Sequence, residues 1–310
     1  MTRTTVKRAD RTYRLGQAQV TAVIDAVIDL PFDLEDFYPD VPLEAWTPWR
    51  RRYAETFWAP NRHRVNYAAY VIQQDGLRIL VDAGMGPKDA PMSQAVAAVA
   101  GERELLHNPH RLLAGLREIS IAPEDIDIVV LTHLDPDHVG WALRCDQRGP
   151  TRTFPNARYV VHEADWAAFH GAGWDRDAPF EYLPTSVSPL ATMDQLQLMS
   201  RPVMSLSENV SLRLAAGHTP GHLVAVVQDS RRLLYLLGDA LAHPAQISEP
   251  SWCSTADRSP DQAIATRLAL LDRLERENAV FAASHFPQPY FGRIGTGAGG
   301  REWTPDPETR

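Results

Sequence analysis

Four potential metal ligands lie within six residues in the run His133-Leu134-Asp135-Pro136-Asp137-His138. Histidine nitrogen and carboxylate oxygen are the donors of catalytic zinc, manganese and iron sites, which keep one coordination position open for water. Pro136 has no amide hydrogen and biases Asp135 toward an extended backbone, so we expect a loop in which alternate side chains converge. A turn with ordinary polar residues is the alternative. These residue types at this spacing predict a metal site.

Three further segments place a histidine or an aspartate after a predicted strand. They are Gly217-His218-Thr219-Pro220-Gly221-His222, Gly238-Asp239 and Ser284-His285. Taken singly, Asp239 could be a surface cap and His285 a structural hydrogen-bonding residue. Four strands that end in such residues at one sheet edge would instead build a site for two metal ions. Two ions bridged by a carboxylate and a hydroxide activate water against a carbonyl or phosphoryl centre, so hydrolysis is the expected chemistry.

The elements that must position these residues alternate between strands and helices. The run 126–131 is short and β-branched, which predicts a buried strand that delivers His133. Residues 67–72 and 77–82 flank the turn 73–76 and predict a β-hairpin. Further strands are expected at 158–162, 209–214, 223–228, 233–237 and 279–283, and helices at 91–99, 109–118, 163–170 and 260–277. This alternation predicts an α/β layered fold.

Residues 1–64 have no spacing that predicts a regular element. Prolines interrupt the segment, and its aromatic residues follow neither a helical nor a strand period. We expect an irregular N-terminal extension over residues 1–64 that packs on a catalytic domain of residues 65–310. The aromatic side chains of the extension could wall an apolar pocket or pack in a core: Trp46, Trp49, Tyr53, Phe57 and Trp58.

The ordered set of motifs across residues 65–295 resembles that of the metallo-β-lactamase superfamily. The pattern of that family is His-x-His-x-Asp-His, followed by Gly-His, an Asp and a late His. The segments 217–222, 238–239 and 284–287 most resemble the branch that contains quorum-quenching lactonases and methyl parathion hydrolase. The resemblance implies a four-layer αββα sandwich with the site at one sheet edge. It specifies the substrate only weakly.

The resemblance also implies seven ligands divided between two ions. The first ion would be held by His133, Asp135 and His218, and the second by Asp137, His138 and His285, with Asp239 bridging both. We expect Asp137 and Asp239 to take part in catalysis as well. His222 is usually not a ligand in this family, so we interpret it as a supporting or structural residue. Asp82, at the end of the predicted hairpin, either supports the metal loop or is an ordinary turn carboxylate.

Asp135 departs from the family pattern, which has histidine at this position. With a third carboxylate, two divalent ions would keep a net charge of about +1 instead of about +2, and bound water would be less acidified. Oxygen in place of nitrogen also shifts the metal preference toward manganese or iron. We therefore expect two divalent ions, zinc first, with manganese or iron as alternatives. A second interpretation is that the short side chain of Asp135 does not reach the first ion, so that only the second ion stays bound.

Composition and charge exclude several classes of protein. The 310-residue chain is 44% hydrophobic and 23% charged, as globular proteins are, and has no apolar run of about 18 residues. Its net charge of −8 argues against a general nucleic-acid-binding protein. The N-terminus lacks the apolar region of a secretory signal, and two cysteines, Cys145 and Cys253, are too few for a disulfide framework. We expect a cytoplasmic protein with reduced thiols, a small-molecule substrate and no nucleic-acid or membrane partner, and we leave a homodimer open.

The leading hypothesis is hydrolysis of a lactone, ester or related carboxyl or phosphoryl compound by a metal-bound hydroxide. Two alternatives use the same fold. In the first, iron at the oxygen-rich site supports non-hydrolytic oxygen or redox chemistry, and the identity of the bound metal distinguishes it. In the second, the chain is a binding protein on a decayed enzyme scaffold, and native protein without metal would be its signature.

Overall fold

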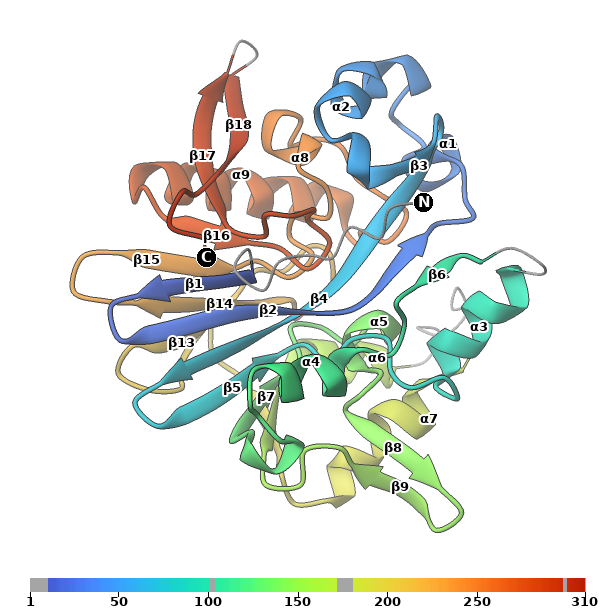
Figure 1. The fold of residues 1–310 in the computed structure, drawn as a ribbon, viewed down its shortest axis with the longest axis vertical. Coiled ribbons are helices and arrows are strands. Elements are labelled where there is room, and N and C mark those ends of the chain that lie inside the picture. Colours follow the sequence, from blue (N-terminus) through green and yellow to red (C-terminus); the bar gives the residue numbers. More distant parts are fainter. Residues whose placement is uncertain (1–10, 101–103, 172–180, 298–299, 310) are drawn as a thin grey trace.

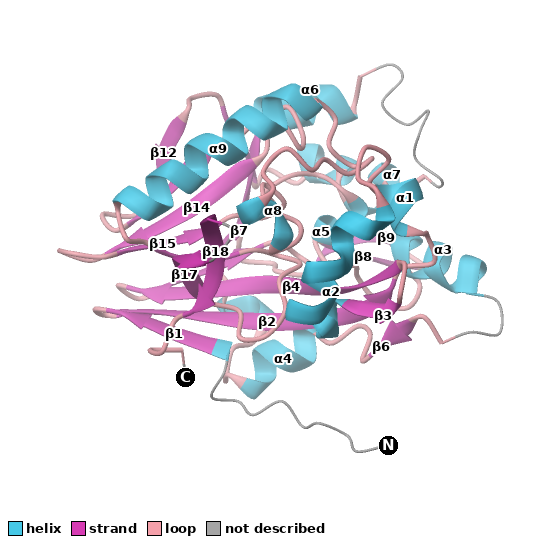
Figure 2. Cartoon of the chain, turned by 90° about the horizontal axis from the view of Figure 1, so that it is seen from above, coloured by secondary structure: helices cyan, strands magenta, loops and turns pink. Residues whose placement is uncertain are grey.

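Two β-sheets lie face to face at the centre of the molecule, and helices cover their outer faces (Figure 1, Figure 2). The structure is a computed structural model that describes residues 11–100, 104–171, 181–297 and 300–309. A single hydrophobic cluster contains buried side chains from both sheets, from Val20 and Ile72 in one to Leu212 and Val280 in the other. The α/β sandwich predicted from the sequence is therefore confirmed.

The first sheet contains nine strands among the described residues, in the order β1-β2-β4-β5-β7-β10-β11, with β3 on β4 and β6 on β2. Their bounds are β1 (Thr12–Leu15), β2 (Ala18–Asp29), β3 (Phe57–Ala59), β4 (Arg62–Gln74), β5 (Leu77–Val81), β6 (Leu106–His107), β7 (Ile128–Val130), β10 (Arg158–His162) and β11 (Leu196–Met199). Strands β5, β7 and β10 run parallel to one another. Their carboxyl ends therefore meet at one edge, where the segment after β7 carries His133.

The second sheet contains seven strands within the described ranges, in chain order from β12 to β18. Their bounds are β12 (Val203–Ser205), β13 (Val210–Leu214), β14 (Leu223–Gln228), β15 (Leu233–Leu236), β16 (Val280–Ala282), β17 (Gly292–Gly297) and β18 (Gly300–Pro305). A separate hairpin joins β8 (Leu143–Asp146) to β9 (Gly149–Arg152). Because β15 and β16 are parallel neighbours, Asp239 and His285 emerge at the same end of this sheet.

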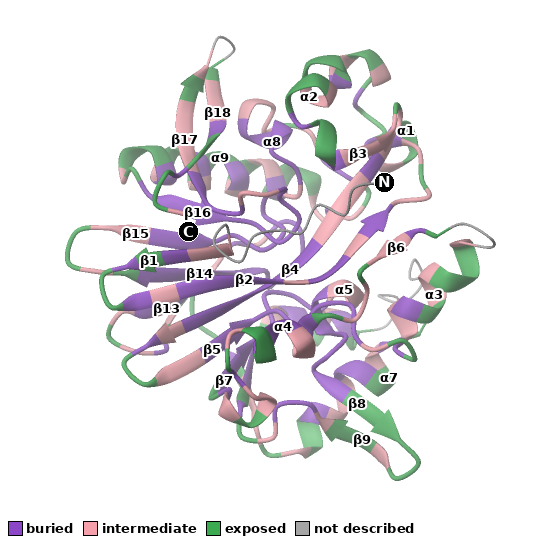
Figure 3. Ribbon diagram, in the orientation of Figure 1, coloured by how far each residue is buried: buried purple, intermediate pink, exposed green. Residues whose placement is uncertain are grey.

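Alternate side chains of the strands enter different cores. In β4, Tyr70 and Ile72 belong to the cluster between the sheets, whereas Ala69 and Val71 belong to the cluster beneath the helices of the first sheet. A strand presents successive side chains to opposite faces, so apolar residues on both faces are expected where both faces are covered. The strands that are accordingly buried along most of their length are β2, β4, β5, β7, β10, β14, β15 and β16 (Figure 3).

The helices are short except for one. Their bounds are α1 (Leu34–Phe37), α2 (Thr47–Arg52), α3 (Pro91–Ala100), α4 (Leu112–Glu118), α5 (Pro136–Val139), α6 (Glu163–Phe169), α7 (Leu183–Ser186), α8 (Ala245–Ser248) and α9 (Pro260–Arg276). Helix α4 packs on the first sheet through Leu112 and Leu116. Helix α9 packs on the second sheet through Leu271 and Leu274. These contacts complete the α, β, β, α order of layers.

Residues 12–29 correct the prediction that the segment 1–64 is irregular. They form β1 and β2, and β2 pairs with β4 from Gln19 opposite Gln73 to Asp29 opposite Arg64. The signal was present in the sequence, because residues 18–29 are rich in β-branched residues. The prolines that interrupt the segment begin at Pro31, beyond this strand. They therefore do not argue against a strand over residues 18–29.

Residues 34–56 form a lobe of short helices, and here the prediction of an irregular, aromatic-rich segment is close to the structure. Trp46 and Tyr53 are buried, so they pack in a core instead of walling an open pocket. The Trp46 ring lies 5.0 Å from that of Tyr38 and 4.6 Å from that of Trp252.

Strand β4 runs through residue 64, the boundary expected between the N-terminal extension and the catalytic domain. The division of the chain into these two domains stays a prediction.

The other predicted elements are confirmed, with bounds that differ by a few residues. The hairpin is β4–β5, and the expected helices are α3, α4, α6 and α9. Each strand expected beyond residue 120 is present as well, as β7, β10, β13, β14, β15 and β16. No helix in the described part of the chain is long and apolar enough to cross a membrane.

Candidate metal centre

The candidate ligands lie on four segments that follow strands. The first segment leaves β7, and Asp135 keeps the extended backbone that the following proline favours, with φ −66° and ψ 149°. From Pro136 the chain forms the single turn of α5, which carries Asp137 and His138. The predicted loop therefore ends in one helical turn. The remaining segments lie between β13 and β14, after β15 and after β16.

Three side chains, His133, Asp135 and His218, form what we call the first ligand group. Their ligand atoms lie close enough together to hold one metal ion. Oδ2 of Asp135 is 3.5 Å from Nε2 of His133 and 3.4 Å from Nε2 of His218. The aspartate that departs from the family pattern thus reaches the same point as the two histidines.

A second ligand group consists of Asp137, His138 and His285, which could also hold an ion. Oδ2 of Asp137 is 3.4 Å from Nε2 of His138 and 3.6 Å from Nε2 of His285. Asp239 lies between the two groups. Its Oδ1 is 3.4 Å from His138, and its Oδ2 is 2.9 Å from His285 and 3.6 Å from His218 of the first group. All seven predicted residues therefore converge on one place.

The donor atoms of this cluster have the environment that a cation requires. Buried polar atoms in proteins almost always have a hydrogen-bond partner. Here, four buried atoms that point to the centre have none: Nε2 of His133, His138 and His218, and Oδ1 of Asp239. Imidazole nitrogen and carboxylate oxygen suit zinc and other first-row divalent ions. The residues present therefore fit divalent metal ions.

The charges of the cluster shift the pKa values of its members strongly. Burial by itself disfavours every charged form, but the neighbouring carboxylates raise the pKa of His138 and His285, and that of His218 to about 10. The histidines in turn hold the pKa of Asp135, Asp137 and Asp239 below the usual range, against the effect of burial. The centre thus combines anionic carboxylates with imidazoles of raised pKa. The ligand nitrogens of these imidazoles must lose their protons before a cation can bind.

Asp82 and Thr132 orient two of the candidate ligands. Asp82 accepts a hydrogen bond from Nδ1 of His138 at 2.9 Å. The Thr132 hydroxyl donates to the same carboxylate at 2.9 Å, so its oxygen is left to accept from Nδ1 of His133 at 3.0 Å. Both imidazoles therefore carry a proton on Nδ1 and direct Nε2 to the centre. Of the two interpretations of Asp82, the structure favours support of the metal loop.

The other two histidines have partners that were not predicted. Asp257 accepts from Nδ1 of His218 at 3.1 Å, and the buried Arg267 lies 3.3 Å from the other Asp257 oxygen. His285 donates from Nδ1 to the carbonyl oxygen of Asn66 at 2.8 Å. Backbone and side-chain partners of this kind carry no local sequence signal, because they lie far from their histidines along the chain.

A model of the metallo-beta-lactamase superfamily matches residues 64–285. This chain belongs to that superfamily. It is also 29% identical, over 183 residues, to the N-acyl homoserine lactonase AiiB of Rhizobium rhizogenes. That match covers 55% of this chain and 60% of the relative, so it spans less than two thirds of the lactonase.

Two solved structures share the metallo-beta-lactamase fold over nearly the whole chain. One is AidC, a dizinc quorum-quenching lactonase in complex with a product, with a TM-score of 0.76, 23% identity, and coverage of 96% of this chain and 97% of that chain. The other is the hydrolase AbOPH, with a TM-score of 0.77, 21% identity and the same coverage. At these identities the two structures establish the shared fold.

His222 lies outside the two ligand groups and contacts the backbone of Asp239. Its Nε2 accepts a hydrogen bond from the backbone N–H of Asp239 at 3.0 Å, and its side chain is fully buried. The loop 217–222 is held in turn by Asp165, whose carboxylate accepts from the Thr219 hydroxyl at 2.8 Å and from the Gly221 N–H. A Cβ on Gly221 would lie 2.5 Å from the Asp165 nitrogen, so only glycine allows this approach.

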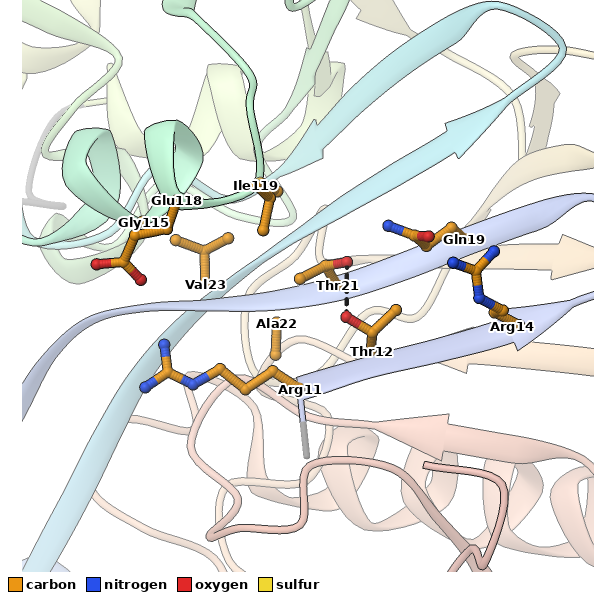
Figure 4. A pocket seen from close by; sticks show the side chains of 10 residues that line it. All are labelled: Arg11, Thr12, Arg14, Gln19, Thr21, Ala22, Val23, Gly115, Glu118 and Ile119. Carbon is orange, nitrogen blue, oxygen red and sulfur yellow. Dashed lines mark hydrogen bonds between the residues drawn. The ribbon is translucent and has the colours of Figure 1, made fainter. Parts of the chain in front are cut away.

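The remaining features that the sequence singled out lie away from the metallo-beta-lactamase centre. Cys145 is exposed, Cys253 is buried, and both are free thiols, as predicted. A hollow of about 750 Å³ lies between β1, β2 and α4, and Figure 4 shows its lining. It is lined by Arg11, Thr12, Arg14, Gln19, Thr21, Ala22, Val23, Gly115, Glu118 and Ile119. None of the candidate ligands lines this hollow, so it is separate from the site.

Proposed function

We propose that this protein is a metal-dependent hydrolase that opens lactones, with related esters as further substrates. The observation that carries the proposal is the pair of ligand groups on either side of Asp239. Their buried donor atoms point to one centre, and several of these atoms have no hydrogen-bond partner. Membership of the metallo-beta-lactamase superfamily supports a hydrolytic centre. The likeness to AiiB, an N-acyl homoserine lactonase, supports lactones as the first substrates to test.

The first ligand group would hold one divalent ion and the second group the other, with Asp239 between them. We propose zinc first, since its ligands in proteins include histidine and carboxylate, and manganese or iron as alternatives because Asp135 replaces a nitrogen donor with oxygen. Two such ions, when bound, would supply a water of lowered pKa and positive charge next to the carbonyl oxygen.

The residues of the chain then have separate tasks. Water adds to the carbonyl carbon, the ring C–O bond breaks, and the leaving alkoxide needs the proton that the water loses. Asp137, with a side chain 15% exposed against 8% for Asp239, is the more open carboxylate. We assign to Asp137 the transfer of that proton to the leaving oxygen, and to Asp239 the holding of both ligand groups together.

The test is hydrolysis by protein reconstituted with zinc, manganese or iron, on a panel of N-acyl homoserine lactones, aryl esters, thioesters and phosphotriesters. We expect turnover of lactones that is lost on chelation, restored by metal, and reduced at least about 100-fold in Asp137→Asn. A panel without any turnover by metal-loaded protein would contradict the proposal. Elemental analysis of the native protein gives an independent check, since stoichiometric iron with a visible absorption band would point to redox chemistry instead.

A further inference from the structure

A buried tyrosine lies directly beside the second ligand group. Tyr67 on β4 is 5% exposed, and its ring meets that of His285 edge to face, with centroids 5.2 Å apart and planes at 74°. The ring also packs in an apolar cluster with Ala26, Ile28 and Met85. The phenol is therefore fixed on the side of the centre formed by His285.

The backbone next to Tyr67 is held against the same segment. The Asn66 carbonyl oxygen accepts from Nδ1 of His285 at 2.8 Å, and the Asn66 side chain donates to the carbonyl oxygen of Phe286 at 2.8 Å. The backbone N–H of Ala68 donates to the carbonyl oxygen of Ser284 at 3.1 Å. Contacts on both sides of Tyr67 thus tie its position to that of His285.

The hydroxyl of Tyr67 has no hydrogen-bond partner among the described residues. Buried tyrosine hydroxyls usually find one. Elsewhere in the chain Tyr70 donates to the Ala283 carbonyl oxygen at 2.9 Å, Tyr159 to that of Ala142 at 3.0 Å, and Tyr235 to the Glu277 carboxylate at 2.6 Å. Tyr38 also lacks a partner in the described ranges, but its ring contacts are with the aromatic lobe.

A phenol ionises only near pH 10, so a tyrosine hydroxyl can donate a hydrogen bond at neutral pH. A neutral O–H beside the reacting centre can stabilise an oxygen on which negative charge develops.

We propose that the Tyr67 hydroxyl donates a hydrogen bond to the carbonyl oxygen of the bound lactone or ester, and to the carboxylate of the product, on the His285 side of the centre. The inference rests on the proposed function. It gives the substrate a donor that belongs to the protein chain and is independent of the metal ions. The phenol supplies no proton to the reaction, so the balance of the hydrolysis is unchanged.

The test compares Tyr67→Phe with Tyr235→Phe, which removes a partnered hydroxyl on the outer side of the second sheet. For Tyr67→Phe we expect an unchanged metal content, an unfolding temperature equal to or above that of the wild type, and a kcat/KM lowered about 10- to 100-fold. For Tyr235→Phe we expect the reverse: a lower unfolding temperature, because a hydrogen bond is lost, and an unchanged kcat/KM.

A binding measurement separates this inference from the proposed function. The zinc-loaded proteins are titrated with the ring-opened acid N-hexanoyl-L-homoserine, and we expect about 10-fold weaker binding by Tyr67→Phe than by the wild type. Equal affinity and a kcat/KM within twofold of the wild type would overturn the role of Tyr67. If the wild type hydrolyses no lactone or ester, the proposed function fails, and equal affinity of both proteins for the acid then overturns the inference as well.

Discussion

His218 and Asp257 form a buried carboxylate–histidine pair, with Nδ1 of the imidazole 3.1 Å from Oδ1 of the carboxylate. Arg267, which is 1% exposed, lies 3.3 Å from the second oxygen of Asp257. The carboxylate therefore has a partner on each side and cannot turn away from the imidazole. This arrangement fixes which nitrogen of His218 faces the first ligand group.

Asp257→Asn should weaken metal binding at the first ligand group. The amide keeps the shape of the side chain but removes the charge that orients His218 and increases its basicity, and such outer partners contribute 10- to 100-fold to metal affinity. Competition with a chromophoric chelator measures the affinity. Asp261→Asn, an exposed carboxylate on the first turn of α9, is the matched control and should bind as the wild type does. Equal affinity in the two variants would show that Asp257 plays no part.

Substitutions at Asp135 test whether this carboxylate is a ligand. Asp135→Ala should lower the bound metal from two ions to one per chain, since its carboxylate is one of three donors in the first ligand group. Asp135→His should keep two ions and shift the preference from manganese toward zinc, because nitrogen replaces oxygen. Metal content after dialysis against a zinc and manganese mixture reports both effects. Two ions retained by Asp135→Ala would mean that Asp135 does not coordinate.

Metal binding should release protons. The carboxylates of the centre raise the pKa of His138 and His285, and that of His218 to about 10, so at least His218 is protonated at neutral pH in metal-free protein. Ligand nitrogens must lose those protons, so affinity should increase with pH from 6 toward 9, by about tenfold per pH unit for each proton released. Calorimetric titrations in two buffers of different ionisation enthalpy count the protons. A pH-independent affinity would contradict this expectation.

His63 should make the fold sensitive to acid. Burial lowers the pKa of His63 to about 3 from the usual value of 6.5, so the unfolded chain takes up the proton first as the pH falls. Stability is therefore lost as the pH falls from 6.5 toward 3, by about 1.4 kcal/mol per pH unit, or about 2 kcal/mol at pH 5. His243, whose ring lies 4.8 Å away, acts in the same direction, because burial also lowers its pKa.

His63→Leu should remove this part of the acid sensitivity. Urea unfolding of metal-free protein at pH 7.5 and pH 5.0 measures the free energy lost between the two values, and the variant should lose about 2 kcal/mol less than the wild type. Comparing losses within one protein cancels the packing change that the substitution causes. The exposed His170 provides the control, and His170→Leu should lose as much as the wild type does. Equal losses in all three proteins would exclude a role for His63.

Much of the centre could be predicted because its parts are local in sequence. Each candidate ligand comes within eight residues of a strand end, and Asp239 and His285 come three residues after β15 and β16. Parallel strands bring their carboxyl ends to one edge of a sheet, so a strand prediction also predicts convergence. The same locality explains why the hairpin and helix α9 could be predicted from hydrophobic periodicity.

The sequence by itself thus determined the β4–β5 hairpin, six later strands, four helices and the seven side chains that converge. The tertiary structure alone decided what holds them. His285 meets the Asn66 carbonyl across 219 positions of the chain, and His218 meets Asp257 across 39. Such contacts depend on how the two sheets pack, and no spacing in the sequence encodes them. Packing also decided that residues 12–29 join the first sheet and that the ring of Tyr67 lies beside that of His285.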